Sequence, residues 1–461
     1  MTATAMRHDA RSPENLGALA DQIAGFLAEG RTRTAAAALG GLAAPDWAEI
    51  IENIAAPLRI DALSLLAEHD QAEVLGHLRA DVQDDLARAM AHDHLARLMS
   101  AMSHDERADL WKRLSPELRD ALSPAMARAE REDMRRLSAY PEDTAGAVMT
   151  SDYATIRPDM LVGEALESLR VQARDAETIY TAYVVDARHR LLGVVSLRDL
   201  LVTPDAGRIE RLMQAAPVAC HATDDREDAA RLIARYDLIA LPVLDEAGRL
   251  VGIVTADDAM DVAEAEATED FYKGSTIQPI EDSLAHSTLA TLYRARIFWL
   301  VLLVFGNIFS GAGIAAFEDV IAAHMTLLFF LPLLIASGGN AGAQSATLTV
   351  RALATGDVRQ SDFARLLLRE LVVALGLGLT MAAAVSLIGW WRGGAEIALV
   401  VALAMVLIVL MGAVIGLALP FVLSRLGRDP ATASGPLVTS IADVLGVLTY
   451  FGIAMILLDL G

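Results

Sequence analysis

The chain has 461 residues, of which 54% are hydrophobic and 21% are charged, and its formal net charge is −22 at pH 7. A mean hydropathy of +0.39 is high for a chain with so many charges, which indicates that apolar and acidic residues are segregated along it. An acidic surface disfavours nucleic acid as a partner, and a single cysteine, Cys220, excludes a disulfide framework or a cysteine-based metal site.

The excess of acidic residues lies in the first 290 residues, because residues from 291 onward carry nine acidic and nine basic side chains. The start of the chain, MTATAMRHDARSPENL, lacks the basic end and apolar core of a signal peptide. We therefore expect the acidic region to stay in the cytosol.

Residues 1–140 predict an all-α domain. Leucine and alanine recur at helical spacing from Leu16 to Ala139, interrupted by short polar stretches such as Ser103-His104-Asp105 and Ser115-Pro116-Glu117. Such stretches are typical of helix N-caps followed by acidic first turns. A succession of short helices of this kind predicts a helical superstructure.

Residues 141–260 contain an internal repeat of about 60 residues, with LLGVVSLRDL in the first copy matching LVGIVTADDA in the second. Each copy predicts a helix followed by two strands, which together make a paired α/β module. The predicted helices cover 161–170 and 224–236, and the predicted strands cover 180–186, 191–195, 241–245 and 250–254.

The repeat resembles a tandem pair of CBS domains. In each copy a hydroxyl residue, Ser196 or Thr255, precedes an aspartate by three positions at a strand-to-helix junction. There the aspartate can bind a ribose hydroxyl and the helix N-terminus can face a phosphate, so adenine-nucleotide binding is one interpretation. The candidate nucleotide-binding residues are Ser196, Arg198, Asp199, Thr255 and Asp258. The alternative is that Ser196 and Thr255 only cap the following helices.

Residues 261–290 predict an acidic connecting helix. The run from Asp258 to Asp270, DAMDVAEAEATED, carries carboxylates on most helical turns and no basic residue. Like charges four residues apart on a helix cost a few tenths of a kcal/mol each unless a cation neutralises them. A solvated helix face is the alternative interpretation.

Residues 291–461 predict a bundle of five membrane-spanning helices, because five stretches are long and apolar enough to cross a bilayer. These stretches are 297–317, 321–349, 366–391, 395–423 and 436–460. Most arginines of this region lie in loops that face the cytosol if the N-terminal region does, and only Arg392 falls on the other side.

A run of small and amide residues, Ser337–Thr347, interrupts the second apolar stretch. Small residues allow close helix packing, which is one interpretation. The other is an opened backbone whose carbonyls line an aqueous cavity. The candidate pore-lining residues are Gly338, Gly339, Asn340, Gln344 and Thr439.

Asp443 lies seven residues after Pro436 in the last apolar stretch. That places the carboxylate roughly 10 Å into the span, where an aspartate costs about 2.5 to 3.5 kcal/mol. Apart from Arg369 near the start of the third stretch, these stretches contain no lysine or arginine, so a cation or a proton must neutralise Asp443, unless it is a buried structural residue. Oxygen ligands without cysteine suit Mg2+ or Ca2+, and one aspartate per chain favours a symmetric dimer.

Four motifs make the whole chain resemble the MgtE family of magnesium channels and transporters. They are YPEDTAGAVMT at 140–150, EATED at 266–270, SGGNAGAQSATLTVRALATGD at 337–357 and DPATASGPLVTSIADV at 429–444. The resemblance implies an all-α N-terminal domain, an α/β tandem CBS domain and a five-helix all-α transmembrane domain. It also implies a homodimer in the lipid bilayer of the inner cell membrane, multi-pass, with cytoplasmic N-terminal domains.

The same resemblance implies that Mg2+ enters the cytosol through the pore and that cytosolic Mg2+ closes it. Asp443 would hold the ion in the pore, and Asp429 would lie near its cytosolic mouth. Sensor carboxylates would be bridged by Mg2+ in the closed state and would repel one another without it; they are Asp225, Glu227, Asp237, Asp258, Asp261, Glu266, Glu269 and Asp270. ATP is left open as a regulatory ligand. Ala343 and Gly435 depart from the asparagines common in the family.

The same residues are compatible with other functions. The chain could transport another divalent cation such as Mn2+ or Co2+, or it could be a membrane-tethered sensor that conducts nothing. An anion channel is disfavoured because its path would need cationic groups rather than a lone carboxylate. The sequence shows no phosphate loop, no Ser-His-Asp arrangement and no helical histidine pair, so we do not expect an enzyme.

Overall fold

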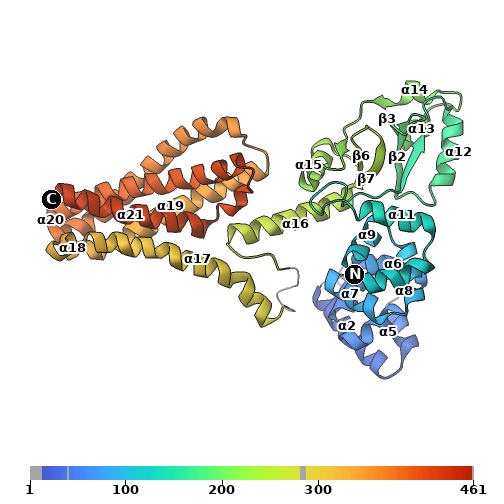
Figure 1. The fold of residues 1–461 in the computed structure, drawn as a ribbon, viewed down its shortest axis with the longest axis horizontal. Coiled ribbons are helices and arrows are strands. Elements are labelled where there is room, and N and C mark those ends of the chain that lie inside the picture. The colour runs from blue at the N-terminus through green and yellow to red at the C-terminus, as the bar shows by residue number, and fades with distance from the viewer. Residues whose placement is uncertain (1–12, 39–40, 281–286, 459–461) are drawn as a thin grey trace, which may run out of the picture. The chain divides into compact units, whose positions relative to one another are not determined.

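The computed structural model describes residues 13–38, 41–280 and 287–458. It divides into two compact units, Met1–Glu264 and Ala265–Gly461. In Figure 1 the first unit runs from blue to yellow-green and the second from yellow to red.

The first part of the first unit is all helical, as predicted. Its helices are α2 (Pro13–Ala28), α3 (Thr32–Ala38), α4 (Ala44–Asn53), α5 (Ala56–Leu63), α6 (Glu68–His77), α7 (Ala80–Ala89), α8 (His92–Ala101), α9 (His104–Arg113), α10 (Pro116–Leu122) and α11 (Arg128–Leu137). Ser115 caps α10 by accepting the Leu118 N–H at 3.3 Å.

The helices form two rows. Helices α2, α4, α6, α8 and α10 pack one on the next, and so do α5, α7, α9 and α11. Each helix therefore contacts the second one after it in the chain, which is the stacking expected of a helical superstructure. Ile50, Leu75, Leu98 and Leu110 are among the fully buried side chains between the rows.

The second part of the unit contains the predicted repeat. The first copy consists of β1 (Tyr153–Ile156), α12 (Val162–Gln172), β2 (Thr178–Val185), β3 (Leu191–Ser196) and α13 (Leu197–Val202). α14 (Ile209–Leu212) and β4 (Gln214–Ala215) follow it. The second copy consists of β5 (Cys220–His221), α15 (Arg226–Tyr236), β6 (Ala240–Leu244), β7 (Leu250–Thr255) and α16 (Ala256–Gly274).

The two copies pair their strands in the same way. β1 is parallel to β2, which is antiparallel to β3, and β5, β6 and β7 repeat this pattern. The two candidate nucleotide hydroxyl residues end equivalent strands, because Ser196 pairs with Thr181 and Thr255 pairs with Ala240. The sheets share a small core around Tyr183. The predicted helices and paired strands are confirmed, whereas β1 and β5 were missed because they are short.

α16 follows β7 without a break and continues to Gly274. The connecting helix predicted over 261–290 therefore starts earlier and ends earlier. It ends at Gly274 because Thr276, two residues later, has a φ of 55°, and Pro279 follows; neither suits a helix interior. Residues 281–286 of the predicted helix lie outside the described residues.

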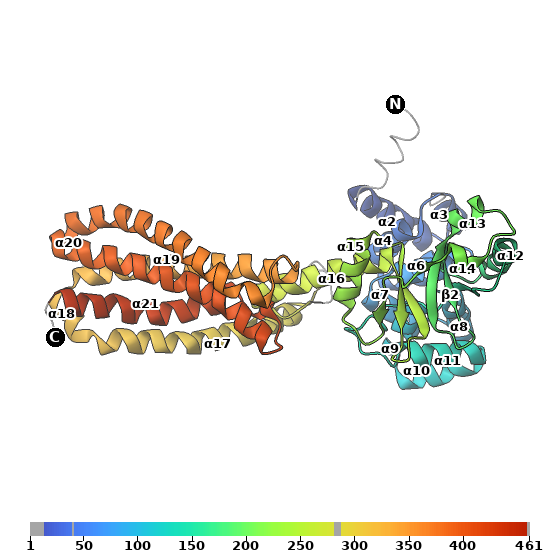
Figure 2. The same cartoon turned by 90° about the horizontal axis from the view of Figure 1, so that it is seen from above.

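The second unit is a bundle of apolar helices. They are α17 (Leu289–Ala316), α18 (Glu318–Ala323), α19 (Thr326–Ala354), α20 (Phe363–Arg425) and α21 (Gly435–Leu457). Four of the described helices, α17, α19, α20 and α21, are long and apolar enough to cross a membrane. Figure 1 and Figure 2 show them running side by side.

α20 has 63 residues and would be about 95 Å long if straight, roughly three times the thickness of a hydrocarbon core. It instead folds back at Gly394, whose φ of 78° and ψ of −172° are not helical. The two arms are antiparallel, because Gly389 packs against Ala398 and Gly378 against Val406. The four helices thus supply five membrane-length arms.

The opened backbone considered for Ser337–Thr347 is wrong, because α19 is helical throughout this run. Its glycines bring backbones together instead. A Cβ on Gly412 or Gly416 of α20 would collide with the carbonyl of Gly338 or Gly342. Close packing by small residues, the other interpretation of this run, is the one observed.

Candidate ion sites

Asp443 lies in α21, eight residues after the helix begins at Gly435. Its side chain is half-buried, and its buried Oδ1 atom accepts no hydrogen bond from any described residue. A carboxylate oxygen without a donor inside an apolar bundle is costly unless a cation or water reaches it.

The candidate pore-lining residues divide into two groups. Gly338 and Gly339 are buried, and a Cβ on either would collide with Ile408 or Thr439, so these positions serve helix packing. Asn340 and Gln344, one turn apart on α19, are exposed within one chain. An exposed amide in a membrane-length helix needs water or another protein surface, because hydrocarbon offers no hydrogen bonds.

Asp429 lies in the short connection before α21 and is brought together with Glu269 of α16 by a lysine. Lys273 Nζ is 2.6 Å from Asp429 Oδ2 and 2.5 Å from Glu269 Oε1. The run Asp258–Asp270 contains no basic residue, but Lys273, one turn after Glu269 on the same helix, supplies a basic partner. Glu266 and Asp270 lie on the same helix.

A cluster of carboxylates gathers where the helical domain meets the second repeat. Asp105 and Glu106 come from α9, Glu177 directly precedes β2, and Asp258 is in the first turn of α16. Burial, and then the neighbouring carboxylates, raise the pKa of Asp105 and of Asp258 to about 7. The pKa of Glu106 also rises to about 7, chiefly through burial, and that of Glu177 rises for the same reason.

Sequence reasoning predicted only Asp258 of this cluster. Asp105 and Glu106 were interpreted as an acidic first turn, which they are, and Glu177 was not singled out. Two adjacent acids at a helix start were the available signal, but the helix dipole explains such a pair equally well.

His104 joins the same two domains beside this cluster. Its Nδ1 is 2.9 Å from Asp133 Oδ2 of α11, and its Nε2 is 3.0 Å from Asp152 Oδ2, which precedes β1. Burial alone would raise the pKa of Asp133, but the bonds and charge of His104 outweigh it and lower that pKa to about 2. Burial raises the pKa of Asp152 to about 6.

Three other predicted sensor residues lie around α15. Asp225 caps this helix by accepting the Glu227 N–H at 2.8 Å, and Glu227 pairs with Arg231 at 2.6 Å. Asp237 ends the helix in a left-handed conformation with φ of 51°. The two ends of an 11-residue helix are about 16 Å apart, so Asp237 cannot share an ion with the other two in one chain.

Asp261, the last predicted sensor residue, lies one turn after Asp257 on α16. Burial, and then the charge of Asp257, raise its pKa. In the described part of the chain, no three histidine, cysteine, aspartate or glutamate side chains are grouped closely enough to hold a metal ion. An ion at these carboxylates therefore needs bound water, a rearrangement or a second copy.

The candidate nucleotide residues have local roles. The Ser196 hydroxyl accepts the Asp199 N–H at 3.0 Å and donates to Asp199 Oδ2 at 2.7 Å. At Thr255 the backbone N–H, at 3.3 Å, and the hydroxyl both donate to the Asp258 Oδ2 atom. Ser196 thus caps α13, which is the capping alternative, whereas the Thr255 hydroxyl donates to the Asp258 side chain. The Arg198 and Asp199 side chains are nevertheless exposed.

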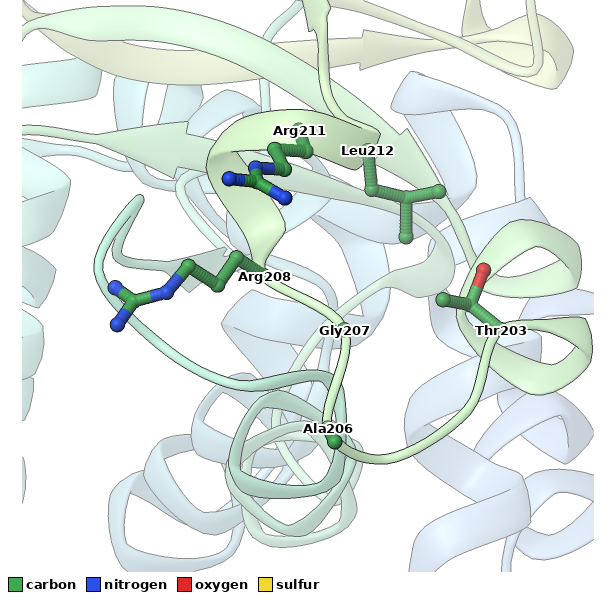
Figure 3. Close-up of a pocket in the computed structure, with 6 residues that line it drawn as sticks. All are labelled: Thr203, Ala206, Gly207, Arg208, Arg211 and Leu212. Carbon is green, nitrogen blue, oxygen red and sulfur yellow. The ribbon is translucent and has the colours of Figure 1, made fainter.

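A cavity of about 350 Å3 lies beyond the end of α13 and is lined by Thr203, Ala206, Gly207, Arg208, Arg211 and Leu212 (Figure 3). Figure 3 shows both guanidinium groups on one side and Thr203 and Leu212 on the other. Asp205 and Glu210 alternate with the two arginines along the chain, so the local charge balances. No candidate nucleotide residue lines this cavity.

Family models match most of the chain. A model described as a divalent cation transporter, MgtE, matches residues 331–453, and one described as the MgtE intracellular N domain matches 42–143. The CBS domain model matches 145–203 and 209–265. The repeat predicted from the sequence is thus recognised in both copies.

Relatives cover most of the chain as well. It is 45% identical over 325 residues to the magnesium transporter MgtE of Thermus thermophilus, covering 70% of this chain and 72% of that one. The magnesium transporter MgtE of Bacillus subtilis is 37% identical, covering 69% and 70%. These relatives are named transporters and not enzymes.

Two solved structures each resemble slightly more than half of the chain. One is the cytosolic domain of the Mg2+ channel MgtE in complex with ATP, with 37% identity and a TM-score of 0.50, covering 53% of this chain and 99% of that one. The other is the soluble part of a magnesium transporter, with 29% identity and a TM-score of 0.50, covering 56% and 100%.

Proposed function

We propose, from the premise that this chain belongs to the MgtE family of divalent cation transporters, that it moves Mg2+ through a pore into the cytosol and is closed by cytosolic Mg2+. It is a multi-pass protein of the cell membrane with cytosolic N-terminal domains. The observation that carries the proposal is the Asp443 Oδ1 atom, buried among apolar helices without a hydrogen-bond donor in the described chain. A permeating hydrated cation supplies what this oxygen lacks.

We place the pore between two copies of the chain. Asn340 and Gln344 are exposed on α19 and Asp443 is only half-buried on α21, so these polar groups are incompletely covered in one chain. A twofold axis would bring two copies of Asp443 to one path and cover the amides with protein and water. Gly338, Gly339 and Thr439 then support the pore wall by packing.

The gate in this proposal is the repulsion among cytosolic carboxylates. Burial, and then the neighbouring carboxylates, raise the pKa values of Asp105, Glu106 and Asp258 to about 7, so these groups resist ionisation at neutral pH. Mg2+ bound among them would offset the repulsion and favour a compact, closed state. The remaining sensor ligands of the proposal are Glu177, Asp225, Glu227, Asp237, Asp261, Glu266, Glu269 and Asp270, with Asp429 at the mouth.

ATP is proposed as a regulatory ligand of the CBS pair, because a related cytosolic domain was solved in complex with ATP. The exposed Arg198 and Asp199 would contact it, with Ser196, Thr255 and Asp258 around the site. We also propose the domain division 1–140, 141–260, 261–290 and 291–461.

Flux of Mg2+, Mn2+ and Co2+ into liposomes containing the purified protein tests the transport proposal. We expect Mg2+ to permeate, and Asp443→Asn to abolish its flux while the protein still elutes as a folded species. Glu396→Gln, which changes an exposed carboxylate of the same unit, is the matched control. Flux of Mn2+ or Co2+ without Mg2+ would favour the other divalent transporter, and no flux of any ion would favour the non-conducting sensor.

A further inference from the structure

We propose that Lys273 is a positioning residue for the ion path: its ammonium group holds Glu269 and Asp429 together when no divalent ion is there, and Mg2+ must displace it to bind them. The inference rests on the proposed function, in which both carboxylates bind Mg2+. It adds a competing cation that belongs to the chain itself.

The geometry of Lys273 matches that of a bridging cation. Its Nζ atom lies 2.5 Å from Glu269 Oε1 and 2.6 Å from Asp429 Oδ2, so one charge contacts two carboxylates. All three side chains are about one-third exposed. Burial lowers the pKa of Lys273, but its bonds to Asp429 and Glu269 outweigh burial and raise it. The group therefore stays charged at any physiological pH and is not a proton switch.

The bridge connects α16 to the start of α21. Asp429 uses its other oxygen, Oδ1, to accept the Ala431 N–H at 2.8 Å, which fixes the short turn Pro430–Thr432. α21 begins three residues later and carries Asp443. Losing or moving the lysine therefore changes how the helix that carries Asp443 is held at its first turn.

A second contact holds the same end of α16. The Gln278 N–H donates to the Ala295 carbonyl of α17 at 2.9 Å, four residues after the helix ends. The Lys273 bridge and this bond fix the segment at two points. Breaking the Lys273 bridge alone should therefore free the end of α16 from Asp429, while the Gln278 hydrogen bond still attaches it to α17.

The choice of lysine at this position is unusual for this chain. Of its 38 basic residues only two, Lys112 and Lys273, are lysine, and the rest are arginine. Lysine is a compact, strongly hydrated point charge, whereas the guanidinium of arginine is planar and bonds carboxylates in a fork. The ammonium group is closer to a small metal cation than the guanidinium group is, so the space that it occupies suits such an ion.

The experiment compares Lys273→Met, Lys273→Arg and the control Lys112→Met in the full-length protein. Mn2+ serves as a paramagnetic divalent probe, and the loss of the free-ion resonance signal reports binding. Because a partly exposed ion pair contributes little to stability, Lys273→Met should bind Mn2+ only about threefold more tightly at one site. Adding Asp429→Asn should remove that gain, and Lys112→Met should bind as the unaltered protein does.

Flux measurements provide a second readout. Lys273→Met should need about threefold less cytosolic Mg2+ for half-closure and conduct more at the lowest Mg2+, because the bridge no longer competes or holds the helix. Lys273→Arg should lie between it and the unaltered protein. Identical Mn2+ binding in Lys273→Met and the unaltered protein overturns the inference. If the unaltered protein does not close with Mg2+, the proposed gating fails, and the Mn2+ titration still decides the role of the lysine.

Discussion

Carboxylates are held in opposite ways in the two units of the molecule. In the first unit most of them lie on helix surfaces and many pair with arginine, as Glu52 does with Arg79 and Asp84 with Arg113. A few are buried beside other carboxylates, and burial first and then these neighbours raise their pKa values, as in the cluster around Asp105 and Asp258. Among the described residues of the membrane unit a single carboxylate, Asp443, lies well inside a span, and its Oδ1 atom accepts no hydrogen bond from them.

The two arrangements suit different roles, cation sensing in the first unit and ion conduction in the second. A crowded cluster responds to cation concentration, because each added negative charge makes the next cation more favourable. An isolated carboxylate in a narrow apolar surrounding binds one ion at a time and releases it, as conduction requires. The predictions below test each side of this comparison, beginning with the largest expected effect.

Gly412→Ala should destabilise the membrane bundle. The added Cβ would collide with the Gly338 carbonyl of α19, and backbone cannot move aside as a flexible side chain can. Overpacking of this kind costs about 1 to 3 kcal/mol and sometimes more. The yield of monodisperse protein and its melting temperature report the effect. Gly376→Ala is the control, since a Cβ there has open space; equal stability of both variants would contradict the packing account.

Metal-free protein should lose stability as pH rises. The carboxylates of Asp105, Glu106 and Asp258 have pKa values of about 7 when folded and about 4 when unfolded, so the folded state holds protons more tightly. Their contribution is fully present below about pH 4 and is lost as pH approaches about 7. Thermal melting in EDTA should show a lower transition at pH 8 than at pH 5.

Mg2+ should restore more stability at pH 8 than at pH 5, because protons no longer compete for the carboxylates at the higher pH. In the double variant Asp105→Asn and Asp258→Asn, the melting temperature in EDTA should change less with pH. The stabilisation by Mg2+ should also differ less between pH 5 and pH 8. A melting temperature in EDTA that is the same at the two pH values would show that the cluster is not under electrostatic strain.

Gln344→Leu should reduce flux severalfold without unfolding the protein, because it removes an exposed amide from the proposed pore face of α19. Thr380→Val is the matched control: Thr380 is equally exposed on the first arm of α20, but its hydroxyl already bonds the Gly376 carbonyl. Equal flux in both variants would argue that α19 faces lipid here.

His104→Asn should have the smallest effect, a loss of about 1 kcal/mol in the stability of the first unit, because a side-chain bridge between Asp133 and Asp152 is removed. His69→Asn changes an exposed histidine and serves as the control. Chemical denaturation of the full chain, followed by tryptophan fluorescence, measures both. No difference between the two variants would mean that His104 does not hold the domains together.

Features set by local pattern could be predicted from the sequence. The repeat, the apolar stretches and the position of Asp443 depend on the spacing of residues that are close in the chain. The turn at Gly394 could be predicted, because this glycine lies between two predicted spans, 366–391 and 395–423. The sequence left open whether Ser337–Thr347 packs as a helix or opens its backbone, because the glycines of α20 that pack on it lie about seventy residues away.

The carboxylate contacts depend on distant parts of the chain. Lys273 and Asp429 are 156 residues apart, and Asp105 and Asp258 come from different domains. Nothing in the local pattern of either residue indicates the partner. An acidic helix start and a lone lysine are compatible with many structures, so only the tertiary arrangement distinguishes a structural acid from a candidate sensor.

The most direct test is Mg2+ flux into liposomes, measured side by side for the unaltered protein, Asp443→Asn and Asp258→Asn, at low and high cytosolic-side Mg2+. The account predicts no flux from Asp443→Asn at either concentration, and flux from Asp258→Asn that persists at the high concentration where the unaltered protein closes. Undiminished flux from Asp443→Asn would contradict it.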